Sequence, residues 1–305
     1  MIAVAGPTAS GKTALGVGIA KAMGGEVISC DSMQVYRKMG IATAAPTTEE
    51  MQGVPHHLVG ILEPDEEYSV AQFCIDANKA ADQIVGRGAI PVLVGGTGLY
   101  MNSFADNITF MGSSSADVRT LLQTRLQQEG AEVLLNELAK IDPEYAAKLH
   151  LSDTKRITRA LELYYADGIT MTEQVARSHD TPSRFDTLMI GINFADRQKL
   201  YDRINRRVDI MLSNGLVQEA EQAYLNRGLT AAQAIGHKEL FDYFDGTATL
   251  DECVERLKMQ TRRYAKRQLS WFRRDQRIHW LYADDEDAQS LMAQAIKIIK
   301  KEWQL

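Results

Sequence analysis

The chain has 305 residues, 24% of them charged, and a formal net charge of −6, which is typical of a globular protein with one or two domains. It contains no apolar run of about 20 residues, so we expect no membrane span, and an apolar segment followed by glycines stands where a signal peptide would begin. Cys30, Cys74 and Cys253 are too far apart for a Cys-x-x-Cys site, so we expect reduced thiols and a cytoplasmic protein.

The first pattern in the chain is a glycine-rich loop between a predicted buried strand at 1–5 and a predicted helix at 14–23. Its sequence is Gly6-Pro7-Thr8-Ala9-Ser10-Gly11-Lys12-Thr13. This matches the phosphate-loop pattern of Gly, four residues and Gly-Lys-Thr, in the strand-to-helix context that the motif requires. Backbone N–H groups and Lys12 would hold phosphate oxygens, and the Thr13 hydroxyl would bind Mg²⁺. The plainer alternative is a glycine turn without a ligand.

Strand-like and helix-like segments then alternate. Strands are predicted at 26–30, more weakly at 57–62, and at 90–94, and a helix follows the Ser69 cap to about residue 87. This alternation predicts a parallel sheet covered by helices. Asp31 follows the second strand directly, and ligands of such sheets lie beyond the carboxyl ends of the strands. Asp31 could therefore be a general base or a metal ligand, or it could simply cap a turn.

A second glycine-rich turn, Gly95-Gly96-Thr97-Gly98, follows the strand at 90–94. The third glycine of a dinucleotide-binding fingerprint is missing, so a backbone-and-hydroxyl site facing the same crevice is the better interpretation. Thr97 could then donate to a phosphate or hold a substrate atom. A tight strand-to-helix turn explains the pattern equally well.

The middle of the chain changes character, because residues 113–186 predict helices only, at 116–129, 131–140 and 153–166, with a further helix capped by Thr170. Strand character returns at 187–193 and at 278–282. We therefore predict an α/β core formed by 1–112 and 187–305, with an all-helical insertion at 113–186. Within the insertion, a basic helix face is equally compatible with nucleic-acid contact and with a solvated surface. Its residues are Lys155, Arg156 and Arg159.

Two basic segments follow the insertion. In the predicted helix 196–214, one of Arg203, Arg206 and Arg207 could reach a pyrophosphate, although a solvated face paired with nearby aspartates is the simpler interpretation. From 262 to 277, basic residues are interleaved with aromatic ones, a pattern that suits RNA even though some of the rings must be core. The basic residues are Arg262, Arg263, Lys266, Arg267, Arg273, Arg274 and Arg277, and the aromatic ones are Tyr264, Trp271 and Phe272.

Taken together, these motifs resemble the bacterial tRNA dimethylallyltransferases, also called tRNA isopentenyltransferases. The matching series, in chain order, is Gly6 to Thr13, Asp31 to Arg37, Gly95 to Tyr100, Asp142-Pro143-Glu144, Asp153 to Leu161, Arg207 to Met211, Ala234 to Glu239 and Thr261 to Arg273. The resemblance covers nearly the whole chain. It departs from the family pattern at Lys155, where Gln is usual, and at His237, where Tyr is usual.

The resemblance implies a P-loop NTPase-like parallel sheet flanked by helices, with a helical insertion domain that contacts tRNA. It implies transfer of a dimethylallyl group from dimethylallyl pyrophosphate to N6 of the adenine at tRNA position 37, next to the anticodon, in tRNAs that read codons beginning with U. Asp31 would be the general base, Thr97 and Arg207 would bind the reacting groups, and the phosphate loop with Thr13 would hold pyrophosphate and Mg²⁺. The residues that would contact the tRNA anticodon stem-loop are Asp31, Ser32, Met33, Gln34, Thr97, Arg119, Lys155, Arg156, Ile157, Thr158 and Arg159.

Three other functions share part of this pattern. The first is an isopentenyltransferase that acts on free adenine nucleotides, and the second is a small-molecule kinase that uses ATP on the same loop. The helical insertion and the basic segments argue against both, because neither activity needs them. The third is a tRNA-binding protein without catalysis, which the presence of Asp31, Lys12 and Thr13 disfavours. We expect a monomer that works without a membrane.

Overall fold

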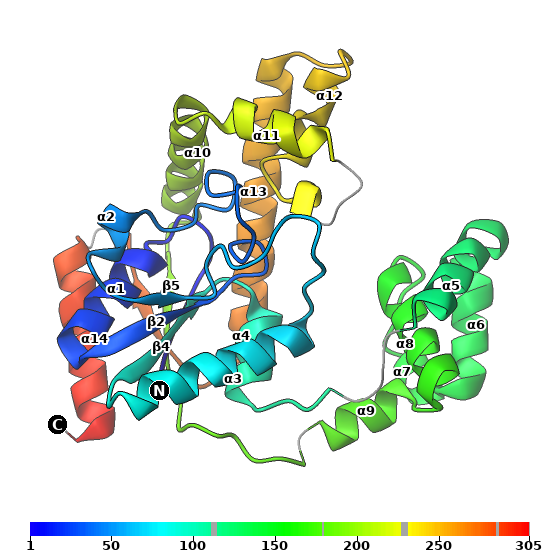
Figure 1. Cartoon of the computed structure of the whole chain (residues 1–305), viewed down its shortest axis with the longest axis horizontal. Coiled ribbons are helices and arrows are strands. Elements are labelled where there is room, and N and C mark those ends of the chain that lie inside the picture. The colour runs from blue at the N-terminus through cyan, green and yellow to red at the C-terminus, as the bar shows by residue number, and fades with distance from the viewer. Residues whose placement is uncertain (111–114, 179, 227–230, 285–286, 305) are drawn as a thin grey trace. The chain divides into compact units, whose positions relative to one another are not determined.

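A computed structural model describes residues 1–110, 115–178, 180–226, 231–284 and 287–304. The chain divides into two compact units (Figure 1). The core unit comprises Met1–Ala105 and Phe185–Leu305, and the helical unit comprises Asp106–Arg184. The first domain boundary predicted from the sequence, at 112–113, lies outside the described residues. The second, at 186–187, falls just after the division at 184–185.

The core unit is built on a six-stranded parallel sheet in the order β3-β2-β4-β1-β5-β6, which confirms the predicted α/β class. Its strands are rich in Val and Ile, and the four central ones are almost wholly buried, as expected when helices cover both faces. The strands are β1 (Ile2–Ala5), β2 (Gly25–Cys30), β3 (His56–His57), β4 (Ile90–Gly95), β5 (Leu188–Asn193) and β6 (Ile278–Tyr282).

The third strand is much shorter than the predicted 57–62. Only His56 and His57 join the sheet, beside Val27 and Ile28. The chain then turns, because Leu58 and Gly60 take left-handed φ angles of 63° and 59° that an extended strand cannot contain. Farther along, Leu62 forms one isolated bridge.

Two apolar layers sandwich the sheet (Figure 1). Helices α1 (Lys12–Met23), α10 (Arg197–Ser213) and α14 (Ala288–Trp303) contribute to one layer, and α3 (Val70–Gly86) and α4 (Gly98–Ala105) contribute to the other. Helix α13 (Leu250–Phe272) contributes to both, through Ala265 and Leu269 on one side and Phe272 on the other. This double role brings the basic segment predicted at 262–277 to the sheet.

The amino-terminal half of α13 belongs to a separate apolar cluster with α10 and α11 (Leu216–Tyr224). The shorter elements of the core unit are α2 (Thr48–Met51), α12 (Phe241–Phe244) and two 3₁₀ turns at Ala231–Gln233 and Lys238–Leu240. Within the described ranges, no helix combines the length and the apolar character that a membrane span needs.

The helical unit has its own core, centred on Leu122, Leu134, Leu138, Ile157 and Leu161. Its helices are α5 (Ala116–Glu129), α6 (Ala131–Ile141), α7 (Pro143–Ala146), α8 (Thr154–Asp167) and α9 (Met171–Arg177). The bounds of α5, α6 and α8 match the sequence prediction to within one residue, and α9 follows its predicted Thr170 cap, whereas α7 was not predicted. Caps set these bounds: Ser115 accepts from the Val118 N–H, and Thr170 forms a capping box.

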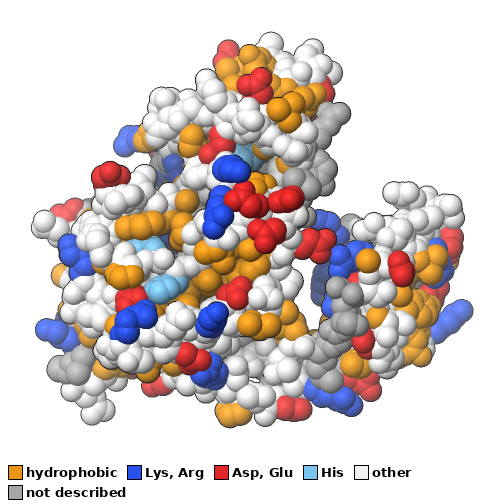
Figure 2. Space-filling view, viewed as in Figure 1, with side chains coloured by type: hydrophobic (Ala, Val, Ile, Leu, Met, Phe, Trp, Pro, Cys, Tyr) orange, Lys and Arg blue, Asp and Glu red, His pale blue; other side chains and the backbone are white. Residues whose placement is uncertain are grey.

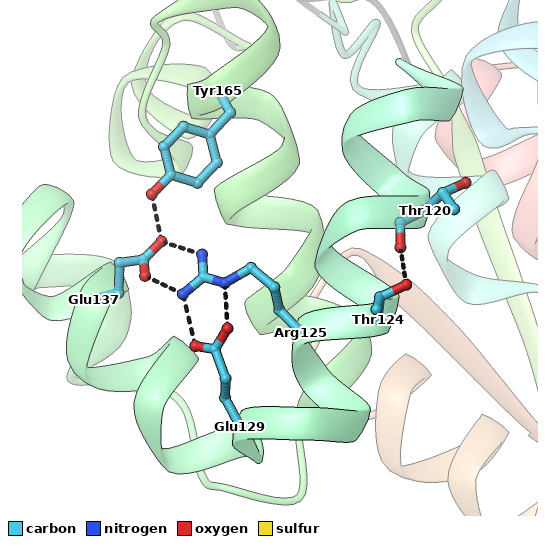
Figure 3. Close-up of polar contacts among 6 residues, drawn as sticks. All are labelled: Thr120, Thr124, Arg125, Glu129, Glu137 and Tyr165. Carbon is cyan, nitrogen blue, oxygen red and sulfur yellow. Dashed lines mark hydrogen bonds and ion pairs between the residues drawn. The ribbon is translucent and has the colours of Figure 1, made fainter.

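One guanidinium ties three of these helices together. Arg125 of α5 binds the carboxylates of Glu129 and Glu137, and Tyr165 of α8 donates its hydroxyl to Glu137 of α6 (Figure 3). Two carboxylates on one cation leave this cluster with a surplus negative charge. We call these four residues the Arg125 cluster.

Candidate active site

The phosphate loop takes the conformation that its glycines allow. Gly11 precedes α1 at a left-handed φ of 95°, and Gly6 has a φ of 154° with no room for a side chain, because an added Cβ would lie 3.0 Å from the Ile192 carbonyl oxygen. Lys12 folds back and donates to the Pro7 carbonyl at 2.6 Å. The loop therefore offers backbone N–H groups, a lysine and a helix N-terminus in one place, which is the equipment of an anion site.

A single glutamine ties this loop to the second glycine-rich turn. Gln268 of α13, which is buried, accepts from the Thr8 N–H at 2.8 Å and donates to the Gly96 carbonyl at 2.9 Å. From α10, Arg203 donates to the Ala9 carbonyl at 2.9 Å. The loops that follow β1 and β4 are thus fixed against each other by side chains from far along the sequence.

Asp31 forms a tight turn at the carboxyl end of β2. Its Oδ1 accepts from the Met33 and Gln34 N–H groups at 2.9 and 3.3 Å, which is the turn-capping role that the sequence left open. The hydroxyl of Thr97 accepts from the Ser32 N–H at 3.2 Å. The structure therefore brings together the two strand ends that the sequence singled out.

Gln34 uses its side chain within the core unit. Its Oε1 accepts from the Ser29 hydroxyl at 2.9 Å, and its Nε2 donates to the carbonyls of Thr43 and Ala44. The side chain thereby anchors the segment that follows it, next to the Asp31 turn.

The electrostatics place Lys12, Asp31 and Arg207 in one cluster. Burial and the repulsion of Arg207 lower the pKa of Lys12 to about 7, and the attraction of Asp31 offsets only part of this. Burial likewise lowers the pKa of Arg207, against the same attraction from Asp31. Burial raises the pKa of Tyr264, and the charge of Asp31 adds to that rise. Glu50 also attracts Arg207, but burial outweighs both carboxylates, so an anionic ligand would favour the charged forms of Lys12 and Arg207.

The loop also suits a magnesium ion. Among the described residues, none forms a hydrogen bond with the buried hydroxyl of Ser10, and Thr13 lies in the first turn of α1. No cluster of three His, Cys, Asp or Glu side chains able to hold a metal occurs in the described part of the chain. Mg²⁺ commonly needs only one or two protein oxygens when phosphate and water supply the rest. The residues therefore fit a magnesium that arrives with a phosphorylated ligand.

The predicted RNA contacts in the helical unit lie on α8 and α5. Lys155 and Arg156 are exposed, and Arg156 lies 3.7 Å from the Asp153 carboxylate and over the Tyr145 ring. The other predicted contacts are not simply exposed; they are Ile157, Thr158, Arg159 and Arg119. Ile157 is fully buried in the core of the unit, so its side chain does not reach the surface, and the Thr158 hydroxyl bonds the helix backbone. Arg159 and Arg119 both bind Glu162, at 3.0 and 3.4 Å.

A basic groove runs along the carboxyl-terminal half of α13. It encloses about 440 Å³ and is lined by Arg263, Lys266, Arg267, Ser270, Trp271 and Arg274. Trp271 is 40% exposed. Figure 2 shows that Lys and Arg side chains occur on both units together with Asp and Glu on the face in view. The basic groove along α13 is therefore a local concentration of positive charge on a chain whose net charge is negative.

Comparison with known proteins identifies the family of this chain. A sequence model of the family described as IPP transferase matches residues 34–275. The chain belongs to this family. A tRNA dimethylallyltransferase of Halalkalibacterium halodurans is 47% identical over 292 residues, covering 94% of this chain and 92% of that protein. One from Acetivibrio thermocellus is 42% identical over 301 residues, covering 97% and 96%.

Solved structures of family members share the fold. The tRNA isopentenylpyrophosphate transferase of Bacillus halodurans aligns with a TM-score of 0.73 at 43% identity, over 98% of this chain and 95% of that one. A eukaryotic dimethylallyltransferase, described as acting on tRNA, aligns with a TM-score of 0.83 at 31% identity, over 99% of this chain and 79% of that one. The phosphate loop lies outside the residues that the family model matches, so its geometry is independent support for an anion site.

Residues that the sequence analysis left without a role complete the site. Gln268 and Tyr264 occur in a segment that we noted only for its charge and rings. His237 departs from the family pattern and is fully buried, where its Nε2 lies 2.8 Å from the Glu219 carboxylate. Glu219 in turn accepts from the N–H groups of Ile41 and Ala42. The histidine thus supports the segment that Gln34 holds from its other end.

Proposed function

We propose that this protein transfers a dimethylallyl group from dimethylallyl pyrophosphate to N6 of an adenine beside the anticodon of tRNA, at position 37. The observation that carries the proposal is the set of hydrogen bonds that joins an anion site to a carboxylate. Gln268 links the phosphate loop to the Gly96 carbonyl, and the neighbouring Thr97 hydroxyl accepts from the Ser32 N–H beside Asp31. The names of the relatives and the family membership support the same reaction. In this proposal the acceptor is an adenine in tRNAs that read codons beginning with U.

The carboxylate deals with the acceptor. The N6 lone pair attacks the allylic carbon, the C–O bond to pyrophosphate breaks with its electron pair leaving on oxygen, and the N6 proton passes to Asp31. An adenine amine is a weak nucleophile and a weak acid, so a positioned base contributes about 10²–10⁴ in rate. Thr97, which binds the backbone next to Asp31, would orient the amine. A stacked adenine cannot reach this carboxylate, so the base must be flipped out of its stack.

The cations deal with the leaving group. Negative charge grows on the pyrophosphate as the C–O bond breaks, and Lys12, Arg207 and the N–H groups of the loop are placed to stabilise it. Magnesium held by Thr13 would supply further charge to the same oxygens. Because Gln268 fixes the loop, these donors are oriented before the substrate binds.

Two basic surfaces would hold the RNA. One is the α8 face of the helical unit with Lys155, Arg156 and Arg159, and the other is the α13 groove, where Trp271 offers a ring for a splayed base. A substrate of nucleotide size would need neither surface. In this proposal the protein works in the cytoplasm, where tRNA is available; its three cysteines, all buried thiols, suit a reducing compartment.

The deciding experiment incubates the protein and Mg²⁺ with radiolabelled dimethylallyl pyrophosphate and either tRNA or AMP. We expect label in tRNA and none in AMP. Label in AMP alone would assign the protein to free nucleotides. A parallel reaction with γ-labelled ATP and tRNA, but without the prenyl donor, tests the kinase alternative, and phosphate transfer to any acceptor would overturn the proposal.

A further inference from the structure

Glu162 lies buried between two arginines of the helical unit. It is 4% exposed, and each of its carboxylate oxygens meets a different guanidinium: Oε1 lies 3.4 Å from Arg119 of α5, and Oε2 lies 3.0 Å from Arg159 of α8. Both arginine side chains stay about two-fifths exposed, at 41% and 42%. One hidden carboxylate therefore joins two partly exposed cations from separate helices.

This arrangement has the opposite charge balance to the Arg125 cluster. There, one guanidinium is held between two carboxylates, and its side chain is only 24% exposed (Figure 3). Around Glu162, two guanidiniums share one carboxylate, so the cations outnumber the carboxylates among these three side chains. The Arg125 cluster joins helices of the unit to one another, whereas the arginines that pair with Glu162 keep part of their side chains exposed to solvent.

A buried carboxylate between two arginines limits how those arginines move. A free arginine loses side-chain entropy when it binds a phosphate, and this loss weakens binding. An arginine that is already anchored through one edge loses less, and its planar guanidinium has five N–H donors to share. The Glu162 carboxylate thus prepares two cations at a fixed spacing.

We propose that Glu162 is a positioning residue for RNA binding, which holds Arg119 and Arg159 ready for backbone phosphates of the tRNA. The inference rests on the proposed function, because it takes tRNA as the ligand of this surface. It assigns a role in binding an anion to a side chain that is itself an anion and does not touch the RNA.

The test exploits this difference in sign. Glu162→Gln removes one negative charge from the helical unit, so charge alone predicts tighter tRNA binding. Positioning predicts weaker binding, by about tenfold, because the two arginines lose their shared anchor. The matched control is Glu129→Gln, which changes the charge of the same unit equally but affects only Arg125. Binding to a tRNA transcript is measured across a salt series, with KM and kcat for tRNA measured alongside.

We expect Glu162→Gln to raise Kd and KM for tRNA, to leave kcat at saturating tRNA unchanged, and to keep the wild-type salt slope, since both cations remain. Thermal melting checks that the variant folds. If Glu162→Gln does not fold, Glu162→Asp takes its place in the experiment. This substitution keeps the negative charge but shortens the side chain, so it should also raise Kd for tRNA. Binding as tight as that of Glu129→Gln would overturn the proposal.

Two arginine variants separate this inference from the proposed function. Arg119→Ala and Arg159→Ala should each raise Kd and flatten the salt slope. If they do so while the Glu162 variants bind normally, only the positioning role is wrong. If neither arginine variant changes tRNA binding, this surface does not bind RNA, and the tRNA-contact part of the proposed function fails with it.

Discussion

Lys12 makes donor binding depend on pH in a direction that can be worked out in advance. Burial and the neighbouring Arg207 lower the pKa of Lys12 to about 7 in the unliganded protein. A bound pyrophosphate adds several negative charges next to the ammonium, so the pKa of Lys12 must rise on binding. Binding is therefore coupled to the uptake of a proton whenever the free protein holds Lys12 in its neutral form.

The size of the effect follows from that value. At pH 8 a group with a pKa of about 7 is only about one-tenth protonated, so binding should take up about 0.9 proton. Above pH 7 the apparent Kd for Mg²⁺-pyrophosphate should rise about tenfold for each pH unit, until the pKa of the bound state is reached. Below about pH 6 the lysine is already charged, and this dependence should vanish.

Isothermal titration calorimetry with Mg²⁺-pyrophosphate, in buffers of differing ionisation enthalpy, measures the proton uptake directly. Lys12→Met is the matched control, because it removes the titrating group and leaves the proton exchange of the ligand itself. Asp31→Asn should move the wild-type transition to lower pH, because the Asp31 charge now raises the pKa of Lys12. Equal proton uptake by wild type and Lys12→Met would refute the reasoning.

Three further outcomes are expected. Asp31→Asn should lower single-turnover prenyl transfer about 10²-fold or more while tRNA affinity changes little, and an unchanged rate would remove Asp31 as the base. Gln268→Ala leaves the Thr8 N–H and the Gly96 carbonyl without their partner, so urea denaturation should show a loss of about 1–3 kcal/mol for each, and KM for the prenyl donor should rise. The double variant Arg156→Ala/Arg159→Ala should weaken tRNA binding and flatten its salt dependence without altering donor binding; wild-type affinity and slope would show that this face is merely solvated.

The parts of the fold that local signals control were predicted well. Helix α5 begins and ends where the sequence placed it, because Ser115 caps one end and Gly130 stops the other. The phosphate loop and Asp31 were found because each directly follows a buried strand, and parallel strands bring their carboxyl ends to one edge. The weak third strand failed because the left-handed turn at Leu58 is invisible in a pattern of apolar residues.

The supporting side chains could not be predicted, because they come from distant helices. Gln268 lies 260 residues from its partner Thr8, and nothing local marks one glutamine in a basic segment as a bridge. The sequence pattern also did not indicate which side chains of α8 face solvent and which face the core. The sequence grouped Ile157 with its basic neighbours, but a helix turns by 100° per residue, and this side chain points into the core while Arg156 points outward.

The chain enters and leaves the helical unit at two points that lie close together. Within it, Asn107 donates to the Pro182 carbonyl at 3.0 Å, and the Thr109 N–H donates to the Ser178 carbonyl at 3.2 Å. On the other side of the junction, the rings of Phe104 and Phe185 lie 6.2 Å apart. The ends of the helical unit therefore lie as close together as the ends of a short loop between α4 and β5 would.

Because the entropy cost of closing a loop grows only slowly with the number of its residues, and these ends already lie close together, a few-residue linker could replace the whole unit at little cost to the sheet. The unit is an inserted domain that could be exchanged as one segment. The share of RNA binding that we propose for the helical unit could therefore be exchanged between relatives by swapping the residues between Phe104 and Phe185, while the α13 groove and the proposed prenyl chemistry stay with the host.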